Sequence, residues 1–110
     1  MPALREYLDD QGRSPFARWF DGLPTPAALK VRAALARIEA GNTSALKSVG
    51  KGVHEARIDF GPGYRVLLGI DGPELVILLG SSAKARQQQA ISRAQERWAD
   101  HRARKRRGDG

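Results

Sequence analysis

The chain has 110 residues, of which 41% are hydrophobic and 28% charged, and its formal net charge is +7. This length suits one domain with a single core, and the composition is ordinary for a globular protein. The absence of cysteine excludes disulfides and thiolate metal sites, and no run approaches the roughly 18 apolar residues of a membrane helix. The N-terminus is too charged for a signal peptide, so we expect a cytoplasmic protein without metal or cofactor.

The positive charge is concentrated in the last quarter of the chain. Residues 1–83 contain ten basic and nine acidic side chains, whereas residues 84–110 contain nine basic and three acidic ones. This asymmetry favours an anionic partner, either nucleic acid or an acidic protein, although a solvated tail that aids solubility is the alternative. We expect residues 1–100 to form the domain and residues 101–110, which lack an apolar stripe, to form a basic, disordered tail.

The first 40 residues predict a short strand, over residues 3–8, followed by two helices. Each helix opens with a hydroxyl residue and a proline, a favourable pair because the hydroxyl can cap the helix and proline suits its first turn. The first helix has an aromatic face that is more typical of a core than of a base-stacking platform, and it ends near Gly22. The second runs to about residue 40. The opening pairs are Ser14-Pro15 and Thr25-Pro26, and the aromatic face consists of Phe16, Trp19 and Phe20.

Residues 53–80 predict three strands joined by tight turns. In the first strand, Ala56 and Ile58 point toward the core, while Glu55 and Arg57 point to the opposite, polar face. The turns are Gly-Pro-Gly at 61–63 and Asp-Gly-Pro at 71–73, and such short connections force antiparallel pairing. Residues 75–79 are all apolar, so we expect that strand to be covered on both faces.

A loop over residues 42–52, with Lys47 and Lys51, precedes these strands, and a last helix is predicted over about residues 84–99. The predicted fold is therefore α+β in the order β-α-α-β-β-β-α, with a helical hairpin and a C-terminal helix packed on a small antiparallel sheet.

Common enzyme signatures are absent, and the candidate site is a set of basic residues. The chain has no P-loop, no Gly-x-Gly-x-x-Gly and no His-Glu-x-x-His. Arg57, Arg65, Lys84 and Arg86 lie on the strands or at the start of the last helix, where they could bind phosphate and stabilise a phosphoryl-transfer transition state. From spacing alone, ordinary surface charge is the competing interpretation.

Four sequence segments resemble the RelE/ParE superfamily of bacterial toxins, in particular the HigB-like addiction-module killer proteins. The specific segment is HEARIDFGPGYRV at 54–66, and LVILLG at 75–80, KARQQQAI at 84–91 and AQERWAD at 94–100 are weaker matches. The resemblance implies a RelE-like fold and a toxin of a type II toxin–antitoxin system. Its expected partners are a cognate antitoxin, a helix-turn-helix protein, together with the ribosome and mRNA.

The implied activity is ribosome-dependent cleavage of mRNA without a metal, which arrests translation. Arg65 and Arg57 match the strand positions of the family that stabilise phosphate, and Lys84 matches a basic position after the last strand. We expect five further residues to bind RNA: Lys47, Lys51, Arg86, Gln88 and Arg93. A ParE-like gyrase inhibitor and a catalytically impaired binding protein are the alternatives.

The sequence departs from this family at the expected proton-transfer position. Relatives of the RelE type often have tyrosine or histidine near the last helix, where this chain has Gln87, Gln88 and Gln89. None of these side chains titrates near neutral pH. His54 is an alternative base, although strict alternation places it on the core side of its strand together with Ala56.

Overall fold

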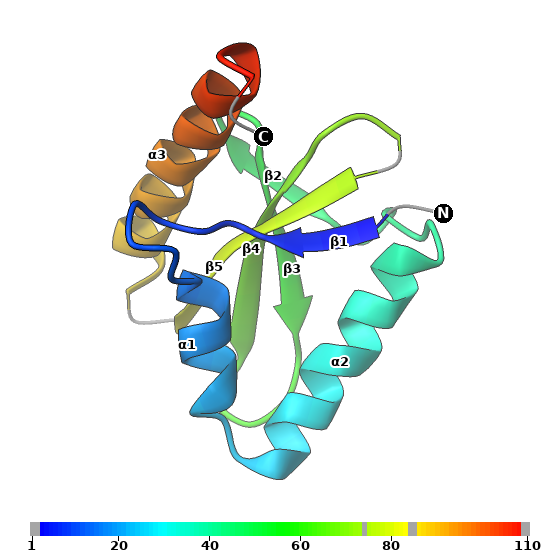
Figure 1. Cartoon of the computed structure of the whole chain (residues 1–110). Coiled ribbons are helices and arrows are strands. Elements are labelled where there is room, and N and C mark those ends of the chain that lie inside the picture. Colours follow the sequence, from blue (N-terminus) through cyan, green and yellow to red (C-terminus); the bar gives the residue numbers. More distant parts are fainter. Residues whose placement is uncertain (1–2, 74, 84–85, 109–110) are drawn as a thin grey trace.

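The computed structural model describes residues 3–73, 75–83 and 86–108. Five strands form one sheet in the order β1-β5-β4-β3-β2, with β1 parallel to β5 and every other pair antiparallel (Figure 1). Three helices pack on this sheet. The elements are β1 (Ala3–Glu6), α1 (Pro15–Asp21), α2 (Thr25–Glu39), β2 (Lys47–Gly50), β3 (Val53–Ile58), β4 (Tyr64–Ile70), β5 (Leu75–Ala83) and α3 (Gln87–Arg106).

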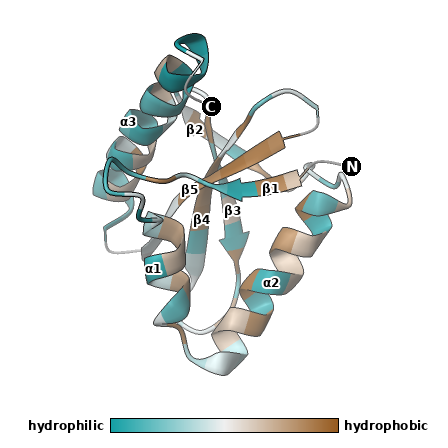
Figure 2. Ribbon diagram, in the orientation of Figure 1, coloured by the Kyte–Doolittle hydropathy of each residue, from teal (hydrophilic) through white to brown (hydrophobic). Residues whose placement is uncertain are grey.

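The sheet separates two hydrophobic clusters, one on each face. On one face, Phe16 of α1 and Val31 of α2 pack on alternate residues of β3, β4 and β5. On the other face, Ile91, Ala94 and Trp98 of α3 pack on the intervening strand residues. Because residues 76–79 of β5 contribute alternately to both clusters, all four are buried, which confirms the prediction for this strand. Hydrophobic residues are concentrated in the strands, whereas α3 is largely hydrophilic (Figure 2).

The structure confirms the α+β class but differs from the predicted sheet in two respects. The expected loop over residues 42–52 contains β2, which pairs with β3. This strand is short and only Val49 in it is partly buried, so its pairing reflects the available edge of β3 more than its own composition. The sheet is also mixed, because β1 joins the edge of β5 in parallel. Such long-range pairing leaves no local signal in the sequence.

The last helix is longer than expected, and the predicted tail is corrected accordingly. α3 continues to Arg106, so residues 101–106 are helical, while residues 109–110 of the expected tail lie outside the described part of the chain. Arg104 of this extension donates to the carbonyl of Leu8 in a distant segment (2.6 Å), and it also pairs with Asp100 one turn earlier in α3 (2.7 Å). None of the helices among the described residues is both long and apolar enough to cross a membrane.

Three further contacts, made by Tyr7 and Asp71, fix the C-terminal half of α3. The Tyr7 hydroxyl, just after β1, donates to Asp100 (2.6 Å), and burial together with this hydrogen bond raises the pKa of Tyr7 to about 12. In the turn after β4, Asp71 accepts from Lys105 (2.7 Å) and pairs with His101 (3.0 Å). The C-terminal half of α3 is therefore bound both to the segment that follows β1 and to the turn between β4 and β5.

The indole of Trp98 lies flat against two glycines that leave room for it. A Cβ atom added to Gly69 of β4 would lie 2.3 Å from the Trp98 ring, and one added to Gly52, before β3, would lie 2.5 Å from its Nε1. Trp98 itself is only 6% exposed. This close approach sets the distance between α3 and the sheet.

We predict that Gly69→Ala lowers the free energy of unfolding by about 1–3 kcal/mol, because the added methyl group overlaps the indole. In a Trp98→Ala background the same change should cost much less, since the two positions share one contact. Urea unfolding of the four proteins measures both values. Gly22→Ala is the control, because a Cβ there meets nothing closer than 3.6 Å. Equal costs in the two backgrounds would contradict this packing.

We predict that Asp71→Asn flattens the acid limb of the stability curve. Hydrogen bonds from Lys105 and then from His101 lower the pKa of Asp71 below its ordinary 3.8. The ionised carboxylate therefore stabilises the fold above about pH 4, and this contribution is lost as pH falls through the lowered pKa. Thermal midpoints between pH 7 and pH 2 should fall less steeply in the variant than in the wild type or in the exposed-site control Asp59→Asn. Parallel curves would refute the role given to Asp71.

Candidate anion-binding groove

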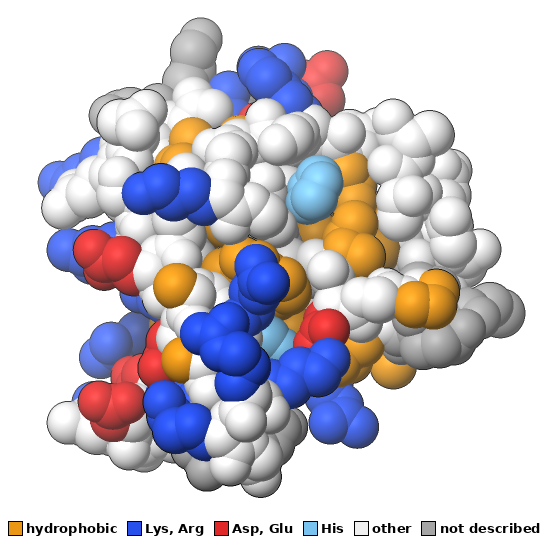
Figure 3. All heavy atoms as spheres, turned by 90° about the horizontal axis from the view of Figure 1, so that it is seen from above, with side chains coloured by type: hydrophobic (Ala, Val, Ile, Leu, Met, Phe, Trp, Pro, Cys, Tyr) orange, Lys and Arg blue, Asp and Glu red, His pale blue; other side chains and the backbone are white. Residues whose placement is uncertain are grey.

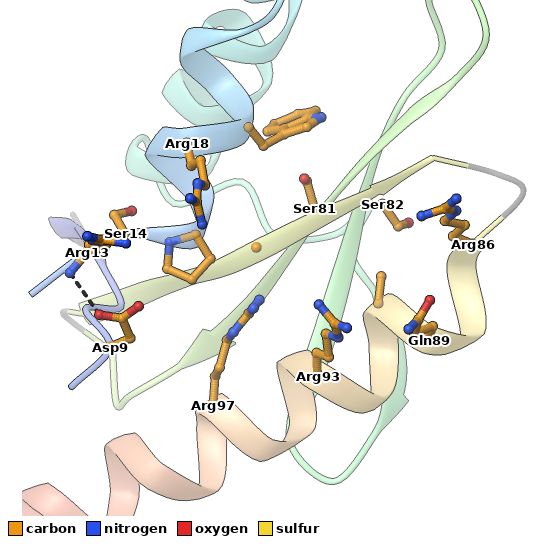
Figure 4. Close-up of a pocket in the computed structure, with 14 residues that line it drawn as sticks. Asp9, Arg13, Ser14, Arg18, Ser81, Ser82, Arg86, Gln89, Arg93 and Arg97 are labelled. Carbon is orange, nitrogen blue, oxygen red and sulfur yellow. Dashed lines mark hydrogen bonds between the residues drawn. The ribbon is translucent and has the colours of Figure 1, made fainter. Parts of the chain in front are cut away.

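An open groove of about 890 Å³ lies between α1 and the first half of α3, beside β5. Its position follows from the short β1, which pairs only with residues 75–78 of β5. Beyond that point the outer edge of β5 has no strand partner among the described residues. Gly80, Ser81 and Ser82 form the floor of the groove at this edge (Figure 4).

Five arginines line this groove, and we call them the arginine groove set: Arg13, Arg18, Arg86, Arg93 and Arg97. Arg18 comes from α1, and Arg93 and Arg97 come from successive turns of α3, so guanidinium groups approach the space from both walls (Figure 4). Pro15 and Trp19 add apolar surface to the α1 wall. Guanidinium groups pair well with phosphate oxygens, so this combination suits an anion with apolar parts.

Among the described residues, Asp9 is the only carboxylate that lines the groove. Its Oδ1 accepts backbone hydrogen bonds from Arg13 and Gln11 (2.9 Å each), and these bonds, the one from Arg13 above all, hold its pKa below the usual value. Asp9 is therefore ionised at neutral pH but leaves a strong excess of positive charge. The described residues contain no group of three or more His, Cys, Asp or Glu side chains that could hold a metal ion.

Arg97 is the most constrained member of the arginine groove set. Its Nη1 donates to the carbonyl of Leu79 (3.0 Å), which closes part of the free β5 edge. Burial, and then the charge of Arg93, lower the pKa of Arg97. Two guanidinium groups one helical turn apart repel each other, so a bound anion between them would relieve a cost present in the free protein.

Arg65, the main residue predicted for catalysis, is buried rather than presented to solvent. Its residue exposure is 6%, and its Nε lies 3.3 Å from Oε1 of Glu55, which is 2% exposed. The other oxygen of Glu55 accepts from Gln87 at the start of α3 (2.9 Å). The face of β3 expected to be polar and open is thus the face that α3 covers, because alternation assigns residues to faces but does not say which face is covered.

The register nevertheless connects Arg65 with the groove. Arg57 lies directly opposite Arg65, and Arg65 lies opposite Ser82, so the three side chains form a row on the α3 side of β3, β4 and β5. Arg57 is exposed. Ser82 is buried, its hydroxyl has no partner, and it also lines the groove. Arg65 therefore lies behind the groove floor.

The structure brings only some of the predicted site residues together. Arg86 and Arg93 line the groove, whereas Gln88 is exposed but outside it. Lys47 lies opposite Glu55 on β2, and Lys51 lies in the β2–β3 turn, both far across the sheet order from β5. His54 is partly buried on β3 and does not line the groove. Lys84 lies outside the described residues.

Sequence reasoning missed Arg13, Arg18 and Asp9 as groove residues. They lie next to or within α1, about 80 residues before Arg93, and only the packing of α1 beside β5 brings them to α3. Arg97 was also missed, although its spacing of four from Arg93 places both on one side of a helix. That spacing was the one available signal.

Comparison with known proteins gives one informative match. No protein-family model matches the chain. The chain is 40% identical over 80 residues to an uncharacterized protein of Haemophilus influenzae, and the match covers 72% of this chain and 81% of that protein. The two proteins belong to one family. Because identity of this extent implies a shared fold, the family member from Haemophilus influenzae is a natural second protein for the tests below.

We predict that Arg65→Ala destabilises the protein described here by about 3–5 kcal/mol, because it leaves Glu55 buried without its counter-charge. The double variant Glu55→Gln with Arg65→Met should recover most of that loss, since both buried charges are then removed. Arg57→Ala, an exposed change of the same kind, should stay within about 0.5 kcal/mol of the wild type. Urea denaturation distinguishes these outcomes, and a stable Arg65→Ala protein would show that the pair is not structural.

Proposed function

We propose that this protein is a toxin of the RelE/ParE type that binds and cleaves mRNA, with the groove between α1 and α3 as its RNA-binding site. The observation that carries the proposal is the arginine groove set: five guanidinium groups lie around the edge of β5, with a single carboxylate among the lining residues that the structure describes. The resemblance of residues 54–66 to HigB-like killer proteins supports the same assignment. We also propose that the mixed sheet with three helices represents a RelE-like fold.

RNA suits this groove on physical grounds. Phosphates of a single strand would pair with Arg86, Arg93 and Arg18, and Trp19 with Pro15 offers apolar surface for a base. Cleavage would begin with attack of a ribose 2′-oxygen on the adjacent phosphorus. The P–O5′ bond then breaks, the 2′-hydroxyl loses its proton, and the 5′-oxygen takes one up, which leaves a cyclic phosphate and a 5′-hydroxyl end.

The groove offers charge stabilisation but little acid–base chemistry. Apart from the arginines, the one titrating side chain among the described lining residues is Asp9, whose lowered pKa makes it a weak base. Of the positions implied by the resemblance, Arg57 is exposed and Arg65 is paired with Glu55. We therefore propose that cleavage depends on the ribosome to complete the site and to position the message. A catalytically impaired binding protein is the alternative that this shortage favours.

Induced expression followed by mapping of transcript ends tests the proposal. We predict cuts within translated messages, which Arg86→Ala with Arg93→Ala reduces by at least about tenfold, since each lost charge-stabilising contact costs roughly 10²–10³ in rate when it acts in the transition state. Arg37→Ala with Arg32→Ala removes the same charge from α2 and is the matched control. Both groove positions are exposed, so stability should not change.

A binding measurement separates RNA binding from cleavage. For single-stranded RNA, loss of two phosphate contacts should lower the slope of log K against log salt by roughly 1.4. Intact messages with normal RNA binding would identify the impaired binding protein. Intact messages together with gyrase-dependent DNA breaks would instead identify the ParE-like inhibitor, and either result would overturn the nuclease assignment.

A further inference from the structure

A second cavity, of about 580 Å³, lies on the other flank of α3 from the arginine groove. Its walls are the C-terminal half of α3, the start of β3 and the end of β4. Arg93 and Arg97 face the groove, whereas Trp98, Arg102 and Arg106 face this cavity, as their helical spacing requires. Figure 3 looks down on this end of the molecule, where Lys and Arg side chains gather over the end of α3.

The positive charge of this second cavity is not neutralised within the described part of the chain. Its one carboxylate, Asp71, is already bound by Lys105 (2.7 Å) and His101 (3.0 Å). The side chains of Arg102 and Arg106 make no hydrogen bond or ion pair with any described residue. They lie one helical turn apart, where like charges repel, so an anion held between them would remove that repulsion.

His54, at the start of β3, also borders this cavity. The register places it opposite Leu68, which packs on the α1 and α2 face of the sheet, whereas Trp98 packs on the other face. Its Nδ1 is buried without a hydrogen-bond partner, so this atom is not presented to the cavity. We therefore assign no ligand contact to the imidazole.

The remaining walls are apolar and the space exceeds that of a single inorganic anion. Ile70, 37% exposed, and the edge of Trp98 form the apolar side, and the volume lies in the usual range for small-molecule sites, about 300–1,000 Å³. We propose that this cavity binds the terminal phosphate monoester of a nucleotide. Arg102 and Arg106 pair with its phosphate, and the nucleoside lies along Ile70 and the edge of Trp98. This assignment does not depend on the proposed nuclease activity.

Calorimetric titration with adenosine 5′-monophosphate tests the assignment, with adenosine and inorganic phosphate as the two part-ligands. We predict saturable binding of the monophosphate, with both part-ligands at least about tenfold weaker, since each has one half of the contacts. Arg102→Ala with Arg106→Ala should weaken binding at least about tenfold, because charged hydrogen bonds are worth roughly 1.5–3 kcal/mol each. Arg32→Ala with Arg37→Ala removes the same charge from exposed positions of α2, outside both cavities, and should leave the affinity unchanged.

Two outcomes would overturn the proposal: no binding of the monophosphate at millimolar concentration, or equal binding by both double variants. Both arginines of the cavity pair are exposed, so the variant should fold, and an unchanged thermal midpoint confirms this. Competition by a 5′-phosphorylated trinucleotide but not by its 5′-hydroxyl form would identify an RNA end as the source of the phosphate. Failure of both to compete would identify the free nucleotide.

Discussion

The contact of Trp98 with Gly52 and Gly69 positions α3, and both candidate sites depend on it. The indole lies against backbone where any side chain would overlap it, so the helix axis can approach the sheet closely only in one register. That register places the side chains of Arg93 and Arg97 beside the free edge of β5 and those of Arg102 and Arg106 beside β3. The contact of Trp98 with the sheet thus determines where the arginines on the two flanks of α3 lie.

Polar contacts then fix the helix at both ends. At its start, Gln87 binds Glu55, which in turn pairs with Arg65 beneath the groove floor. Near its end, Asp100 and Lys105 connect it to Tyr7 and Asp71. A buried ion pair contributes little net stability over apolar residues of the same shape, but loss of one partner is costly. We therefore interpret Glu55 and Arg65 as a support for the groove, with the exposed guanidinium groups available to a ligand.

Local patterns predicted much of the fold, and long-range packing accounts for the rest. The Ser14-Pro15 helix start is confirmed, since the serine oxygen accepts from the amide of Ala17 (3.0 Å), and the turns at 61–63 and 71–73 separate the strands as expected. Alternation in β3 assigned Glu55 and Ala56 to opposite faces correctly but gave no sign that α3 covers the face of Glu55. The groove was only half predicted: Arg86 directly precedes α3 and Arg93 lies in it, whereas Arg18 reaches them through tertiary packing that no spacing in the sequence encodes.

The most direct test of the account uses the two tryptophans, because Trp19 lines the arginine groove and Trp98 lines the second cavity. The indole N–H signals of ¹⁵N-labelled protein can be followed by NMR during titration with single-stranded RNA that lacks a 5′-phosphate. We predict a saturable shift of the Trp19 signal that weakens with added salt, while the Trp98 signal stays in place. RNA binding with an unmoved Trp19 signal would contradict the claim that the groove between α1 and α3 is the RNA-binding site.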